Sequence, residues 1–124
     1  MPKPVELAVS AYIQACTGRD PAVRARLLES CLAADVRMVT RSREIRGRAL
    51  LAKELERFLG DPRLLRVRVI SAIDASGTTF RYRALAELRD GTSAENFDAG
   101  EIDADGRISL ILAFNGPLGD ADAP

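Results

Sequence analysis

The order of the predicted elements indicates an α+β domain, with helices in the first half of the chain and a curved antiparallel sheet in the second. Up to about residue 59, apolar residues recur mainly at helical spacing. After residue 62 the pattern changes to long strand-like runs, and Ser76-Gly77, Asp90-Gly91 and Asp105-Gly106 separate them. Asp-Gly is a strong hairpin signal because both residues tolerate a positive φ. Helices followed by a meander predict two layers, and a sheet that wraps three helices encloses a cone with a pocket at its open end.

Local signals place the boundaries of the helices. Gly18 ends the first helix, Asp20 is a suitable N-cap for the second with Pro21 at its first position, and Gly60 closes the third. A short strand and a strand stub separate the second helix from the third. The predicted helices cover 4–17, 21–32 and 48–59, and the short strands cover 35–40 and 45–47.

The predicted meander strands cover 64–74, 79–89, 93–103 and 107–115. Residues 79–89 alternate clearly: Tyr82, Ala84 and Ala86 face one way, and Arg83 and Glu87 face the other. One face of the sheet is therefore expected to be buried and the other wet. The wet face is expected to be a solvated or dimer-facing surface that carries the arginines Arg63, Arg66, Arg68, Arg81 and Arg83.

Length and charge limit the classes of partner. A chain of 124 residues predicts a single domain, here over 1–118, followed by a small acidic tail at 119–124 that we expect to be disordered. The 18 basic and 18 acidic residues cancel, so nothing favours nucleic acid or an anionic membrane as a partner. No apolar leader or membrane-length segment is seen, and we expect a cytoplasmic protein.

The chain contains no histidine, which excludes Ser-His-Asp and Cys-His catalytic sites. Its two cysteines cannot complete a tetrahedral zinc site by themselves. Cys16 and Cys31 lie on apolar helix faces and are interpreted as buried free thiols. We therefore expect neither a metal nor another cofactor.

Four segments carry a resemblance to a known superfamily. They are Ala11-Tyr12-Ile13-Gln14, Leu32-Ala33-Ala34-Asp35-Val36, Ile45-Arg46-Gly47-Arg48-Ala49-Leu50 and the closing hairpin around Asp105-Gly106-Arg107-Ile108 with its Phe114-Asn115-Gly116-Pro117 end. In this order and spacing they resemble the NTF2-like superfamily, which includes ketosteroid isomerases and SnoaL-type polyketide cyclases. The resemblance implies a cone fold, a small apolar ligand in the cone and a homodimer formed through the outer sheet face.

Comparison with the isomerases suggests roles for particular residues. Tyr12 resembles their oxyanion-hole tyrosine, and Asp98 falls where they have a protonated aspartate; such a pair donates hydrogen bonds to an enolate oxygen. Thr40 stands where the isomerases have their general base, and a threonine hydroxyl cannot accept a proton near neutral pH. The other expected ligand-binding residues are Met38, Thr40, Tyr82, Asn96, Ile111, Ala113 and Asn115.

Two questions stay open at this point. Gapless comparison with the isomerases would turn Arg83 and Glu87 into the pocket, whereas alternation turns Tyr82, Ala84 and Ala86 inward; we follow the alternation, because several buried charges on one strand would each need a partner. The function is either an isomerase- or cyclase-type enzyme or a non-catalytic binding or dimerisation module of the same fold.

Overall fold

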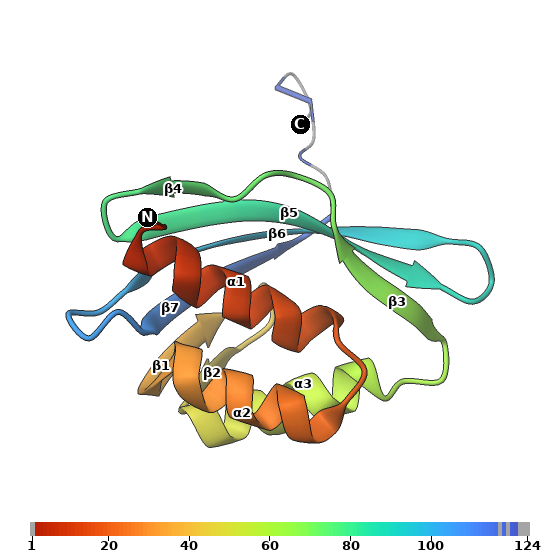
Figure 1. The fold of residues 1–124 in the computed structure, drawn as a ribbon. Coiled ribbons are helices and arrows are strands. Elements are labelled where there is room, and N and C mark those ends of the chain that lie inside the picture. The colour runs from red at the N-terminus through yellow and green to blue at the C-terminus, as the bar shows by residue number, and fades with distance from the viewer. Residues whose placement is uncertain (1, 117, 119, 122–124) are drawn as a thin grey trace.

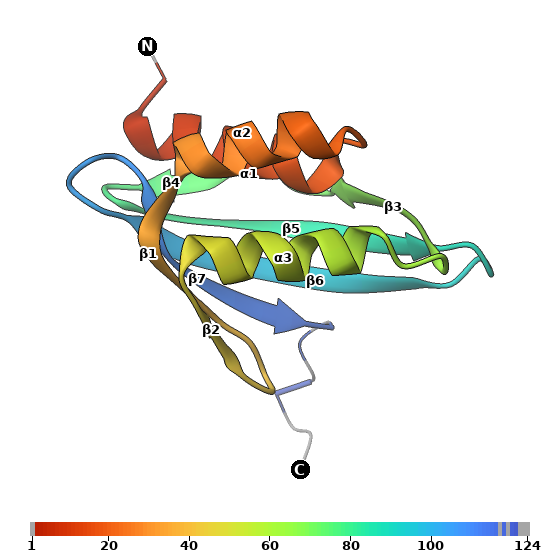
Figure 2. The ribbon, with the colours of Figure 1, turned by 90° about the horizontal axis from the view of Figure 1, so that it is seen from below.

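Three helices lie in the concave side of a strongly curved sheet (Figures 1 and 2). This arrangement comes from a computed structural model that describes residues 2–116, 118, 120 and 121. Most of the predicted tail, 119–124, lies outside the described residues. The helices are α1 (Pro4–Thr17), α2 (Pro21–Cys31) and α3 (Arg48–Leu59), and the strands are β1 (Leu32–Val39), β2 (Glu44–Arg46), β3 (Leu64–Val69), β4 (Asp74–Ser76), β5 (Thr79–Leu88), β6 (Ser93–Ile102) and β7 (Ile108–Asn115).

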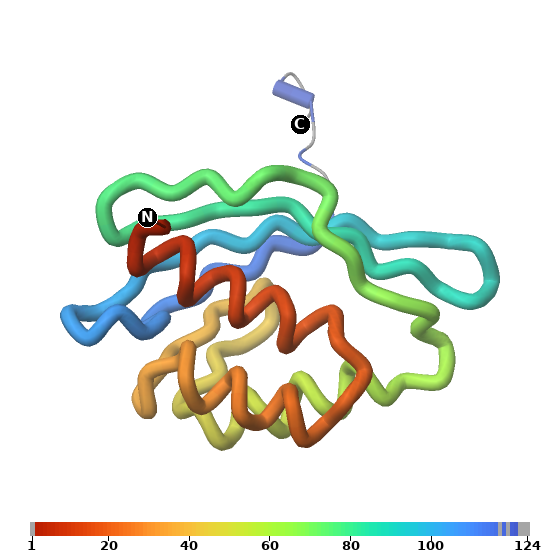
Figure 3. The backbone as a smooth tube through the Cα atoms, in the orientation of Figure 1, coloured from red at the N-terminus to blue at the C-terminus, as the bar shows by residue number. Residues whose placement is uncertain are grey.

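The described strands form one sheet in the order β2-β1-β7-β6-β5-β3, with β4 also paired to β5. All pairs are antiparallel except β1 with β7, which run parallel. The expectation of a wholly antiparallel sheet was therefore wrong in this one place. The chain leaves β1 through β2 and α3, completes the meander and returns beside β1, as Figure 3 lets the reader follow. A parallel pair needs such a long connection, so no hairpin signal in the sequence predicts it.

Two predicted strand boundaries also differ. The first strand begins at Leu32, directly after α2, rather than at residue 35. The predicted strand 64–74 is two strands, β3 and β4, with an interruption at 70–73. In this interruption the backbone N–H of Arg83 donates to the Ser71 hydroxyl at 2.7 Å, so a side chain takes the place of a backbone acceptor. The edge of the sheet is thereby broken without leaving the Arg83 N–H unpaired.

The predicted caps and turns have the expected local geometry. The Asp20 side chain accepts hydrogen bonds from the N–H groups of Ala22 and Val23, which are otherwise unpaired at the start of α2. Gly91 and Gly106 occupy the hairpin turns with φ of 91° and 78°. A residue with a Cβ would be strained at these angles.

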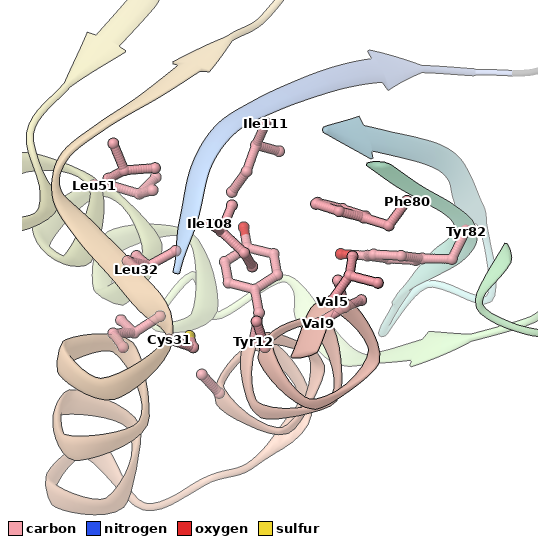
Figure 4. Packing of buried hydrophobic residues seen from close by; sticks show 14 of the residues in the cluster. Val5, Val9, Tyr12, Cys31, Leu32, Leu51, Phe80, Tyr82, Ile108 and Ile111 are labelled. Carbon is pink, nitrogen blue, oxygen red and sulfur yellow. The ribbon is translucent and has the colours of Figure 1, made fainter. Parts of the chain in front are cut away.

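The core lies at the closed end of the cone, between α1, α2 and the sheet (Figure 4). Val5 and Val9 face the sheet from α1, and Ile108 and Ile111 face them from β7. On β7, Ile108 pairs with Ile102 and Leu110 with Glu101, so one extra residue forms a bulge. The bulge turns both isoleucines inward, although their spacing along the chain is odd.

Arg24 is a buried charge that joins all three helices. Its Nε donates to the Ala15 carbonyl at 2.8 Å, one terminal nitrogen donates to the Gly18 carbonyl, and the other pairs with Glu56, both at 2.6 Å. A buried arginine is tolerated when its donors are satisfied in this way. Sequence reasoning did not single out Arg24, because its position in α2 shows nothing unusual.

Candidate functional site

A cavity of about 720 Å³ opens between the helices and the concave face of the sheet. Its wall is mainly apolar, with side chains from α1, α3, β1, β3, β5, β6 and β7. The apolar stripe of α3 lines this space with Leu51, Leu55 and Phe58. Leu51 also belongs to the core and is buried, whereas Phe58 stays 47% exposed. Such a volume suits a ligand of several fused or linked rings.

Asp98 lies in the buried part of the cavity wall and is only 7% exposed. The Tyr82 hydroxyl donates to its Oδ2 at 2.8 Å, and the Asn96 amide donates to its Oδ1, also at 2.8 Å. Both partners are neutral groups. Within residues 2–116, no arginine or lysine forms an ion pair with Asp98, whereas other carboxylates of the sheet do have such partners.

Burial raises the pKa of Asp98 above its usual value, and the hydrogen bonds from Tyr82 and Asn96 oppose this rise. The direction follows from desolvation, because removing water penalises the charged form of a carboxyl group. Asp98 is therefore a carboxyl group that holds its proton more readily than an exposed aspartate.

Tyr12 and Tyr82 reach the same buried region from opposite layers. Figure 4 shows Tyr12 rising from α1 and the hydroxyl of Tyr82 directed toward it from β5. Burial raises the pKa of both phenols far above the usual value, and each is also raised by the nearby Asp98. In the described structure Asp98 bonds to Tyr82, while Tyr12 lies beside the Cys16 thiol one turn along its helix.

Tyr82 is therefore the residue whose importance the sequence reasoning underestimated, because it was expected only on the wall. The sequence did contain a signal for the contact between Tyr82 and Asp98. The β5–β6 hairpin turns at Asp90-Gly91, and antiparallel pairing about this turn places Tyr82 directly opposite Asp98. Directly opposed side chains on one face of a sheet lie within contact distance.

The other predicted ligand-binding residues lie on the cavity wall with one exception. Met38, Thr40, Asn96, Ala113 and Asn115 line the cavity. Ile111 does not; it lies on the same face of β7 as Ala113 but is fully buried in the core. The Thr40 hydroxyl is bonded to the backbone of Arg43, donating to its carbonyl at 3.0 Å.

Charged residues line the more exposed part of the cavity and were not predicted there. Glu54 pairs with Arg43 at 2.5 Å and with Arg57 at 3.1 Å, and Asp61 pairs with Arg63 at 2.8 Å. Hydrogen bonds from these arginines lower the pKa of Glu54 and hold that of Asp61 at about 2. Arg63 was expected on the outer face and lies instead at this mouth, because it follows the turn after α3 and folds back onto Asp61.

The remaining arginines of the predicted outer face do lie there, in ion pairs. Arg81 pairs with Asp74 and Arg83 with Glu95, while Arg66 and Arg68 share Glu87. The alternation along β5 was thus a correct guide: Tyr82, Ala84 and Ala86 line the cavity. Beside the ion pairs, the outer face of β6 and β7 carries Phe97 and Phe114, whose rings meet edge-on with centroids 6.3 Å apart.

The cysteines are free, as expected, and burial raises the pKa of each thiol to about 12. Thiols of this kind are poor nucleophiles. Within the described part of the chain, no group of three or more potential metal-binding side chains comes together. Nor does any helix there have both the length and the apolar character needed to cross a membrane.

Comparison with known proteins gives structural neighbours only. No family model matches the chain, and no curated protein matches it. A putative isomerase of the SnoaL-like family from Agrobacterium tumefaciens superposes with a TM-score of 0.78 at 21% identity, covering 92% of this chain and 98% of its own. An NTF2-like protein of unknown function from Burkholderia xenovorans gives 0.74 at 17%, covering 95% and 87%. A hypothetical protein from Catenulispora acidiphila with a ketosteroid isomerase-like fold, in complex with trimethylamine, gives 0.67 at 16%, covering 88% and 85%.

These likenesses extend over nearly the whole chain, and they define an α+β cone. The chain has the NTF2-like fold, in the form shared with SnoaL-like and ketosteroid isomerase-like proteins. At identities this low the likeness establishes the fold, while function has to be argued from the site.

Proposed function

We propose that this protein binds a small apolar molecule in the cone and stabilises an enol or enolate oxygen at the buried end, as an isomerase or cyclase would. The observation that carries the proposal is Asp98, a buried carboxyl group on the wall of an apolar cavity with no basic partner among the described residues. Burying such a group costs stability, and carboxyl groups perturbed in this way cluster at functional sites. Tyr12 and Asp98 are the proposed catalytic residues, and hydrogen bonds to a developing oxyanion would be their contribution.

The carboxyl groups that line the cavity differ in their pKa shifts, and we assign them different roles. Glu54 and Asp61 are held as carboxylates by arginines, which makes them weak bases. Asp98 is the group whose pKa is shifted toward the neutral range. Thr40 offers no base, and Asp98 is proposed to hold its proton, so the proton acceptor of an isomerisation would have to be another group, such as one on the ligand.

Binding of a phenolic steroid of the equilenin type tests the proposal, because its phenolate resembles an enolate. We expect tight binding by the parent, and a loss of about tenfold or more in both Tyr12→Phe and Asp98→Asn, the size of one charge-assisted hydrogen bond. Fluorescence titration measures the affinity. Parent binding that neither substitution weakens would contradict the proposed oxygen site.

The alternative is a non-catalytic binding module, and the threonine at position 40 is the observation in its favour. Introducing a base at position 40 tests the enzyme hypothesis against the binding-module hypothesis. Thr40 and Asp98 line the same cavity, so Thr40→Asp is expected to create Δ5-3-ketosteroid isomerisation, since a positioned base contributes typically 10²–10⁴-fold. Absorbance follows the reaction in parent, Thr40→Asp and Thr40→Asp with Asp98→Ala. A folded Thr40→Asp protein without activity favours the module.

We also propose a homodimer formed through the outer face of β6 and β7. Phe114 is 56% exposed there, and its ring meets that of Phe97 edge-on. The nearby Arg83–Glu95 ion pair offers both a positive and a negative charge to a second copy. Light scattering tests this: we expect twice the 13.4 kDa chain mass at micromolar concentration, and a monomer for Phe114→Asp. Leu7→Asp is the matched control, because Leu7 is equally exposed, at 57%, on α1. A parent mass of one chain would reject the dimer.

A further inference from the structure

The hydrogen bonds around Asp98 determine where its proton can lie. Oδ1 faces the Asn96 amide nitrogen, which is a donor and cannot accept a hydrogen bond. Oδ2 faces the Tyr82 hydroxyl oxygen at 2.8 Å, which can either donate or accept. A proton on Asp98 therefore belongs on Oδ2 and is donated to Tyr82. The tyrosine hydroxyl is then free to turn its own proton away from Asp98.

The position of Tyr82 shows where its hydroxyl proton can be donated when it turns away from Asp98. The Tyr82 ring lies nearly parallel to that of Phe80, with centroids 6.3 Å apart and planes inclined by 14°, and the residue is buried, which limits where the hydroxyl can move. Tyr82 lines the cavity, and its hydroxyl is directed toward Tyr12 on α1. Two tyrosine hydroxyls thus converge from opposite layers on the same buried space.

We infer that Tyr82 supplies the hydroxyl that meets the ligand oxygen together with Tyr12, and that Asp98 acts through Tyr82 as a positioning residue. This rests on the proposed oxygen site and deepens it by moving the direct contact with the ligand from Asp98 to Tyr82. Two phenol donors in an apolar cavity of about 720 Å³ fit a ligand with a phenol or an enolised carbonyl on an apolar ring system. Asn96 has a defined part as well, because its amide keeps the proton on the oxygen that faces Tyr82.

The ionisation state of Asp98 sets the direction of this chain of hydrogen bonds. When Asp98 is protonated, Tyr82 donates toward the ligand; when Asp98 is ionised, Tyr82 donates back to it and the ligand loses a donor. The other titratable groups near Asp98 are Tyr12 and Cys16 from α1, while β7 places Ala113 opposite it; Cys31 from α2 lies near Tyr82. Burial raises the pKa of these phenols and thiols, so they keep their protons at neutral pH, and Asp98 is the group of this cluster that ionises first as the pH rises.

A double-mutant cycle on the full chain separates a positioning role from a direct contact. The probe is 2-naphthol, with naphthalene as the analogue that lacks the hydroxyl. We expect the parent to prefer 2-naphthol by about tenfold or more, and Tyr82→Phe to lower this preference to what Tyr12 alone contributes. Asp98→Asn should lose part of it, and the double variant should bind no worse than Tyr82→Phe alone. Thr79→Val, which removes an exposed hydroxyl from the start of the same strand, is the matched control and should bind as the parent does.

The outcomes distinguish this inference from the proposed function. Additive losses in the cycle would show that Asp98 touches the ligand itself and would overturn the positioning role. If Tyr12→Phe weakens the preference for 2-naphthol and Tyr82→Phe does not, the inference is overturned and the proposed oxygen site still stands. A parent that does not prefer 2-naphthol over naphthalene would contradict both the inference and the proposed function.

The pH dependence of binding is a second test. The affinity for 2-naphthol should fall with rising pH in the parent but stay constant in Asp98→Asn, at pH values below the pKa of the probe. Identical pH profiles in the two proteins would contradict the inference.

Discussion

The inner and outer faces of the β5–β6 hairpin carry carboxyl groups in opposite environments. On the inner face, Asp98 is buried and bonded to neutral groups, and burial raises its pKa. On the outer face, Glu87 accepts hydrogen bonds from Arg68 and Arg66, and they lower its pKa. The two residues belong to adjacent strands of one sheet. The difference teaches that the side of the strand, rather than the residue type, decides whether a carboxyl group here is suited to chemistry or to solubility.

The largest effect is expected at Gly100, which faces inward on β6. A Cβ at this position would lie 2.0 Å from the Leu110 carbonyl oxygen and 2.9 Å from the Phe80 ring. Gly100→Ala must therefore push β6 and β7 apart, and we expect a loss above about 3 kcal/mol in the free energy of unfolding. Urea denaturation measures it. Ala99→Ser, one position along and facing outward, should change little, and equal losses in the two variants would contradict the close inner packing.

The next largest effect is expected at Arg24, a buried charge with fully used donors. Arg24→Met leaves the Ala15 and Gly18 carbonyls without their partner and removes the link to Glu56. We expect a loss of about 3 kcal/mol, measured by urea denaturation. Arg26→Met, on an exposed position of the same helix, is the control. A loss no greater than that of the control would mean that the buried arginine is structurally dispensable.

Asp98 should reduce stability at neutral pH. A carboxyl group whose folded pKa is raised contributes stability that is present below its unfolded pKa and lost as the pH rises through the folded pKa. We therefore expect Asp98→Asn to be more stable relative to the parent at pH 8 than at pH 4. Thermal denaturation across this range measures the difference. A relative stability that changes in the opposite direction would show that the ionised form is the one the site favours.

The smallest effect is expected at Glu87 on the outer face. Its folded pKa is lowered, so its contribution is present above the unfolded pKa and lost as the pH falls. We expect Glu87→Gln to lose less stability than either of the first two variants, and the loss to shrink as salt is added, because exposed pairs are screened. Thermal denaturation at low and high salt tests this. A large loss of stability that salt does not change would show that Glu87 behaves like a buried charge.

Much of the fold could be predicted because its causes are local. Asp20 with Pro21 determines the start of α2, and the Asp-Gly turns determine where the hairpins reverse. Alternation along β5 was enough to decide that Tyr82 faces the cavity and Arg83 faces solvent, against the direct comparison with the isomerases. Each of these features depends on a few neighbouring residues, and their backbone preferences and apolar pattern can be read from the sequence.

The sequence by itself determined the order of elements, the turns, the inward face of β5 and the presence of Tyr12, Asp98 and Thr40 in one cone. Only the tertiary structure decided that β1 runs parallel to β7, that Ile111 is buried in the core, that Arg63 turns to the mouth, and that Tyr82 rather than Tyr12 holds Asp98. The physical reason is that these outcomes depend on pairs of residues far apart in the chain. Their distances are set by strand register and helix packing, which local preferences do not specify.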